Sequence, residues 1–190
     1  MIGHLPCCVA RCHDLLARSA TGVIAIRKTM QIDRFDISGP FVKATGEATP
    51  FVQDIQSLSE RRGTVRGRHY QAPPHAQGKL VRCTQGAIID VAVDVRSDSP
   101  TYGQHVRVRL SADNGAQLWV PPGFLHGFAT LTDHCLVQYK CTAYYDADCD
   151  AGVAWIDPEL GIDWGLSETD AVISPKDASA PTFAAFQTPF

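Results

Sequence analysis

The sequence predicts a mainly β protein built as an antiparallel sandwich or barrel. Between about residues 50 and 145, short apolar runs with period-two alternation recur at near-regular spacing. Turn sequences rich in Gly, Pro, Asn and Asp separate these runs, and no long helical periodicity appears among them. Short strands joined by such turns are typical of antiparallel sandwiches and barrels.

Residues 87–95 carry the clearest strand pattern. Every second residue from Ile89 to Val95 is Ile or Val, whereas Asp90 and Asp94 fall on the opposite face. This alternation predicts a half-buried strand. Further strands are expected at residues 105–110, 117–120 and 136–140.

The two ends of the chain differ from this central part. Residues 1–29 predict a poorly structured leader, and the native chain is expected to start at Met30, where the strand-like stretch 30–37 begins. Residues 150–190 are rich in turns and are expected to pack over the mouth of the sandwich with one or two short helices. No repeat or linker divides residues 30–190, which we therefore interpret as a single domain.

Composition excludes several classes of function. The formal net charge of −3 gives no bulk attraction to nucleic acid or to an anionic membrane, and no apolar run approaches the length of a membrane span. The seven cysteines are odd in number and form no CxxC pair, which argues against a disulfide framework and indicates reduced thiols in a cytoplasmic protein. A metal cluster of Cys7, Cys8, Cys12 and His13 stays open as an alternative, although no second ligand pair follows at the usual spacing.

Several polar residues interrupt the strand patterns. Arg66 and Lys79 would need an anion or a paired charge if they pointed into a barrel. Arg66 and His69 are three residues apart and would face opposite sides of a regular strand, but a bulge near Gly67 would bring them together. The alternative for each of these residues is a place on a solvated face.

A three-histidine metal site is a second possibility. His69, His75 and His126 could supply the ligands, but the sequence has no close His-x-His pair. We therefore expect no catalytic metal.

Runs spread over residues 51 to about 180 resemble the dTDP-4-dehydrorhamnose 3,5-epimerase family. The order and spacing of these runs hold throughout the stretch. They are residues 51–54 (FVQD), 65–71 (VRGRHYQ), 76–82 (AQGKLVR), 118–128 (LWVPPGFLHGF), 139–145 (YKCTAYY) and 174–177 (SPKD). The resemblance implies a cupin-like jelly-roll sandwich with short C-terminal helices, usually a homodimer, that acts without a cofactor on a dTDP-linked 4-keto-6-deoxy sugar.

The resemblance also implies roles for individual residues. His69 would be the base that removes protons from C3 and C5, and Asp177 would orient it. Lys79 would stabilise the charge that develops on the C4 oxygen, and Tyr139 would return a proton from the opposite face. Residues implied to bind the substrate are Arg66, which would contact phosphate, Gln53 and Tyr145, which would contact the base, and His126, Asp150 and Lys176.

The sequence departs from the family pattern in several places. Residues 38–50 lack an Asp-x-Arg-Gly-x-Phe-x-Glu run that family members use to hold the nucleotide. Ile55 replaces a family Asn and cannot form a hydrogen bond with a pyrimidine, and Asp150 replaces a Glu. Arg68 replaces an apolar residue and is expected to place a charge beside His69 that lowers its pKa. Two hypotheses follow: an active epimerase, or a degenerate paralogue that binds a sugar nucleotide weakly or not at all.

Overall fold

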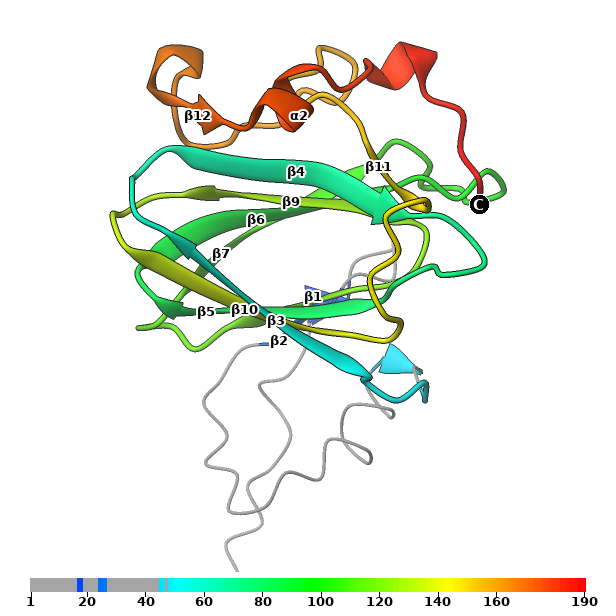
Figure 1. The fold of residues 1–190 in the computed structure, drawn as a ribbon, viewed down its shortest axis with the longest axis horizontal. Coiled ribbons are helices and arrows are strands. Elements are labelled where there is room, and N and C mark those ends of the chain that lie inside the picture. Colours follow the sequence, from blue (N-terminus) through cyan, green and yellow to red (C-terminus); the bar gives the residue numbers. More distant parts are fainter. Residues whose placement is uncertain (1–16, 19–23, 27–44, 47) are drawn as a thin grey trace, which may run out of the picture.

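Two antiparallel sheets stack face to face in the computed structural model, which describes residues 17–18, 24–26, 45–46 and 48–190 (Figure 1). The first sheet has the order β1-β2-β8-β5-β10-β3, and the second has the order β11-β4-β9-β6-β7. The mainly β jelly-roll sandwich expected from the sequence is confirmed. The bounds of the first sheet are β1 Ala17–Arg18, β2 Ile24–Ile26, β3 Gln53–Ser59, β5 Lys79–Gln85, β8 Gln117–Val120 and β10 Cys135–Cys141, and those of the second are β4 Thr64–Gln71, β6 Ala87–Asp94, β7 His105–Ser111, β9 Phe124–Thr130 and β11 Asp150–Gly152.

The C-terminal segment runs over β4 on the outer side of the second sheet (Figure 1). It contains β12 (Val172–Ile173), which pairs with β4 in parallel, and the short helix α2 (Pro175–Ala178). Single 3-10 turns form at η1 (Glu168–Asp170) and η2 (Phe183–Ala185). The expected short helices are therefore present.

Because this segment covers the second sheet, the sheet is buried on both faces. All eight residues of β6 are buried, so the prediction of a half-buried strand is wrong. Ile88 and Ala92 face the core between the sheets, whereas Ile89, Val91 and Val93 pack against the C-terminal segment. Asp90 and Asp94, which the pattern placed on a polar face, are fully buried.

Two short strands lie within residues 1–29. β2 pairs with β1 and with β8, so this pair extends the edge of the first sheet. The strand-like stretch 30–37 and the cysteine cluster of residues 7–13 lie outside the described residues, as does most of the interval 38–50.

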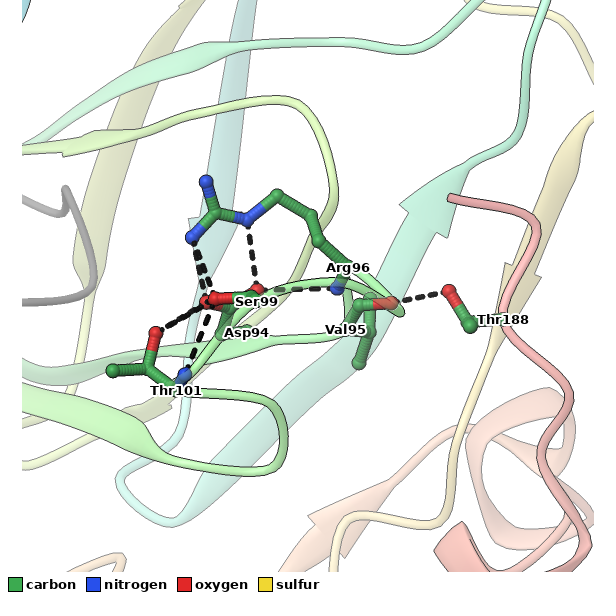
Figure 2. Close-up of polar contacts among 6 residues, drawn as sticks. All are labelled: Asp94, Val95, Arg96, Ser99, Thr101 and Thr188. Atoms are coloured by element: carbon green, nitrogen blue, oxygen red, sulfur yellow. Dashed lines mark hydrogen bonds and ion pairs between the residues drawn. The ribbon is translucent and has the colours of Figure 1, made fainter.

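A buried polar cluster fixes the connection from β6 to β7 (Figure 2). The Asp94 carboxylate accepts hydrogen bonds from Arg96, Ser99 and Thr101. Burial alone would raise the pKa of Asp94, but these bonds outweigh it and lower the pKa to about 2. The Thr188 hydroxyl donates to the Val95 carbonyl oxygen, which ties the C-terminal tail to the same connection.

Candidate active site

A cavity of about 320 Å³ opens between the two sheets and is lined by polar side chains from both of them. Arg66 and His69 reach it from β4, His126 from β9, Lys79 from β5 and Tyr139 from β10, and α2 adds Lys176 and Asp177. Its size and its few convergent polar groups suit a small-molecule site.

A bulge in β4 brings Arg66 and His69 to the same cavity. The pairing of β4 with β9 shifts register between these two residues, and Gly67 between them has φ +97. The backbones are close here, since a Cβ at Gly67 would lie 2.5 Å from the His126 carbonyl oxygen. Only glycine adopts this conformation without strain, so the bulge expected from the sequence is confirmed.

His69 and Asp177 form a closely coupled pair. The distance from His69 Nε2 to Asp177 Oδ1 is 2.5 Å, and Asp177 is only 5% exposed. The second carboxylate oxygen accepts a bond from the Gly67 backbone N–H at 3.3 Å, and the Ser174 hydroxyl caps α2 by accepting from the Asp177 N–H. An ionised carboxylate only accepts, so His69 Nε2 carries the proton and Nδ1 keeps a free lone pair.

A second histidine–carboxylate pair lies on the neighbouring strands. His126 stands opposite His69 in the β4–β9 register, and its Nε2 is 2.7 Å from Asp90 Oδ1. Asp90 is fully buried, and its other oxygen has no hydrogen-bond partner among the described residues. The sequence pattern missed Asp90 because it assigned this carboxylate to a solvated strand face.

Lys79 and Tyr139 face this pair from the first sheet. Burial lowers the pKa of the Lys79 ammonium, which the charges of Cys141, Asp150 and Asp90 partly oppose. Burial raises the pKa of the Tyr139 phenol, so Tyr139 stays protonated at neutral pH. The Tyr139 ring also meets the His126 ring edge-on, with 6.4 Å between the ring centroids.

The other expected binding residues lie around this centre. The Arg66 guanidinium donates to the Ser59 hydroxyl and the Leu58 carbonyl oxygen. Asp150 Oδ2 accepts from both the Tyr145 hydroxyl and the Lys176 ammonium. The Gln53 Oε1 accepts from the Tyr145 backbone N–H at 2.8 Å.

Arg68 does not lie in the cavity. It is 1% exposed, and its Nη2 donates to the Ala154 carbonyl oxygen under the C-terminal segment. Burial lowers the pKa of Arg68 to about 10, and the charge of Asp157 partly offsets this. Successive residues of a strand face opposite sides, so the expectation of a charge beside His69 within the site is wrong.

The expected three-histidine metal site does not form. Within the described part of the chain, no three His, Cys, Asp or Glu side chains are grouped so that they could hold a metal ion. His75 pairs instead with Asp146 at 3.4 Å. No helix of the described residues is long and apolar enough to cross a membrane.

Residues 38–185 match the family model of dTDP-4-dehydrorhamnose 3,5-epimerase. The chain belongs to this family. It is 55% identical over 139 residues to the dTDP-4-dehydrorhamnose 3,5-epimerase of Sinorhizobium fredii, covering 73% of this chain and 71% of the relative. It is 47% identical over 141 residues to the enzyme of the same name from Salmonella typhimurium, covering 74% and 76%.

Solved structures of epimerases share the fold. The dTDP-6-deoxy-D-glucose-3,5-epimerase of Legionella pneumophila, in complex with dTDP-4-keto-L-rhamnose, superposes with a TM-score of 0.79 at 38% identity and covers 87% of this chain and 90% of that one. The dTDP-4-dehydrorhamnose 3,5-epimerase of Bacillus anthracis, with TDP and PPi bound, gives a TM-score of 0.79 at 42% identity and covers 89% and 98%. These similarities favour an active epimerase over a degenerate paralogue.

Proposed function

We propose that this chain epimerises a dTDP-linked 4-keto-6-deoxy sugar at C3 and C5. The observation that carries the proposal is the placing of the His69–Asp177 pair on one sheet and Tyr139 on the other, across one cavity. A proton can leave one face of the sugar and return to the opposite face only if base and acid lie on opposite sides of it.

The first half of the reaction is proton removal. The free Nδ1 of His69 takes the proton from the carbon beside the ketone, the C–H bond breaks, and its electron pair forms the enolate. Asp177 stabilises the imidazolium that results. The Lys79 ammonium stabilises the negative charge on the C4 oxygen.

The second half is protonation from the other face. The Tyr139 hydroxyl gives its proton to the same carbon, the enolate electrons form the new C–H bond, and the configuration is inverted. The proton on His69 and the vacancy on Tyr139 are then restored by exchange with solvent. A ketone already acidifies its neighbouring C–H bonds, so the same chemistry serves C3 and C5.

The cationic groups support binding of a nucleotide diphosphate. Arg66 and Lys176 line the cavity with Lys79 and supply positive charge for phosphate oxygens. The ring of Tyr145 is exposed close to Lys176, since both residues bind Asp150. His126, held by Asp90, contacts the sugar.

The test is solvent exchange. The protein is incubated with dTDP-4-keto-6-deoxyglucose in deuterated water, and deuterium at C3 and C5 is measured by mass spectrometry and NMR. We expect incorporation at both carbons, and none for His69→Ala. His134→Asn serves as the matched control, because His134 is an exposed histidine outside the cavity lining.

The outcomes separate the two hypotheses. No exchange at high concentration of the folded protein would support the degenerate paralogue. Tyr139→Phe adds a second criterion, because it removes the acid and keeps the base. That variant should still exchange deuterium but yield little inverted product.

We further propose that the chain acts as a homodimer in the cytoplasm, as the family resemblance implies. Sedimentation equilibrium should then give twice the chain mass of 20.6 kDa. A single species of the chain mass would contradict the dimer. Fractionation of the source cells tests the location.

A further inference from the structure

The cavity continues along β3 toward an exposed aromatic side chain. Ser57 lines the cavity, and alternate residues of a strand share a face, so Ile55 and Gln53 continue the same wall. Ile55 stands directly opposite Tyr139 in the β3–β10 register. At about 3.3 Å per residue, Gln53 lies roughly 13 Å beyond Ser57 along the strand. A sugar held at Tyr139 can therefore extend its nucleotide toward Gln53.

Tyr145 provides a platform for a flat base at this end. Its side chain is 54% exposed, while its hydroxyl is held at 3.0 Å by Asp150. A fixed phenol with an open ring face suits stacking of a nucleobase. Lys176, bound to the same Asp150 oxygen, supplies a cation for the adjoining phosphate. These features depend on the proposed function, since they assume a nucleotide-linked substrate.

The Gln53 amide is oriented by the backbone next to it. Its oxygen accepts the Tyr145 N–H at 2.8 Å, which fixes the assignment of oxygen and nitrogen. The Nε2 group has no hydrogen-bond partner among the described residues. Gln53 therefore offers a donor to a bound base, and a donor recognises a carbonyl oxygen.

Ile55, the next residue on this face, offers no polar group. Thymine presents an N3–H donor between two carbonyls, whereas cytosine presents an N3 acceptor beside one carbonyl. Both bases share the O2 carbonyl, so a site that reads only a carbonyl does not separate them. A polar side chain at position 55 could reach the N3 edge, but isoleucine cannot.

We propose that Ile55 limits base recognition in this chain to a carbonyl oxygen, so that thymine and cytosine nucleotides bind with similar affinity. Discrimination between bases comes from polar groups that are left unpaired by the wrong base. The Gln53–Ile55–Tyr145 wall combines a stacking surface, one donor and an apolar side chain. It binds the shape of a pyrimidine more than its hydrogen-bond pattern.

Calorimetric titration of the full chain with thymidine diphosphate and with deoxycytidine diphosphate tests the proposal. We expect the two dissociation constants of the wild type to agree within about threefold. Ile55→Val is the matched control and should keep both values. Ile55→Asn should tighten both nucleotides about tenfold, because its carboxamide can accept from thymine N3–H or donate to cytosine N3.

Three results would overturn the proposal. They are a preference of the wild type for thymidine diphosphate above about twentyfold, an Ile55→Asn variant that binds neither nucleotide more tightly, or no binding of either nucleotide. The exchange assay described above decides catalysis separately. Deuterium exchange with unequal affinities would remove only the specificity inference, and equal affinities without exchange would remove only the catalytic proposal.

Discussion

Replacing Arg68 with leucine should make the protein more stable. Arg68 is 1% exposed, and its Nε and Nη1 groups are buried without a hydrogen-bond partner in the described part of the chain. Each unpaired buried donor costs about 1–3 kcal/mol, so the native state carries a penalty of roughly 2–6 kcal/mol at this side chain. Leucine has a similar volume and removes both donors.

The gain is reduced by what Arg68 contributes. Its bond to the Ala154 carbonyl oxygen is charge-assisted and contributes about 1.5–3 kcal/mol, and its attraction to Asp157 is lost as well. Asp157 itself stays satisfied, because its oxygens accept backbone N–H groups of Glu159, Leu160 and Phe183. The net expectation is a stabilisation of about 1–3 kcal/mol, in line with other replacements of buried charges by apolar residues.

Urea and thermal unfolding measure this effect. For a chain of this size the midpoint temperature should rise by about 2–4 °C per kcal/mol. Deuterium exchange should change by less than about twofold, because Arg68 faces away from the cavity. Arg68→Lys keeps the charge, loses the planar donor group and should destabilise. A destabilised Arg68→Leu variant would refute the reasoning and indicate that the two donors have an occupant.

Three further predictions concern the site and the frame around it. Asp177→Asn should slow deuterium exchange by about 10²–10⁴-fold without unfolding the protein, because the amide no longer fixes the tautomer of His69; a loss below about fivefold in single-turnover exchange would contradict the dyad. Gly67→Ala should destabilise by about 1–3 kcal/mol in urea unfolding, because φ is +97 and the Cβ meets the backbone of the neighbouring strand, whereas the control Gly161→Ala, with φ +52 and open space, should lose less. The pKa of Asp94 is lowered to about 2, so its contribution of roughly 2 kcal/mol should be present above about pH 4 and be lost as pH falls toward 2. Asp94→Asn should therefore destabilise at pH 7 and have little effect at pH 2, and equal losses at both pH values would contradict this origin.

The covering of the second sheet explains the main error in reading the strands. Alternation in β6 was read correctly as a strand, yet it predicted a solvated polar face. A period-two pattern reports which residues share a face, but not what lies over that face. The C-terminal segment covers one side of β6 and the first sheet covers the other, so Asp90 became part of the site and Asp94 became part of a buried cluster.

Local sequence was sufficient where the decisive contact is local. Alternating apolar residues with turns between them determined the β architecture, and Gly67 between Arg66 and His69 determined the bulge, because only glycine adopts that backbone conformation without strain. The residue types at the site were also visible through the family resemblance.

Tertiary structure decided what depends on residues distant in sequence. Asp177 meets His69 across 108 positions because β12 pairs with β4 and the Ser174 cap starts α2 beside the site. No periodicity in either segment specifies that meeting. The side on which Arg68 lies, and the burial of Asp90 behind His126, likewise depend on which surface packs over each strand, and packing is a property of the assembled sheets rather than of any one run of residues.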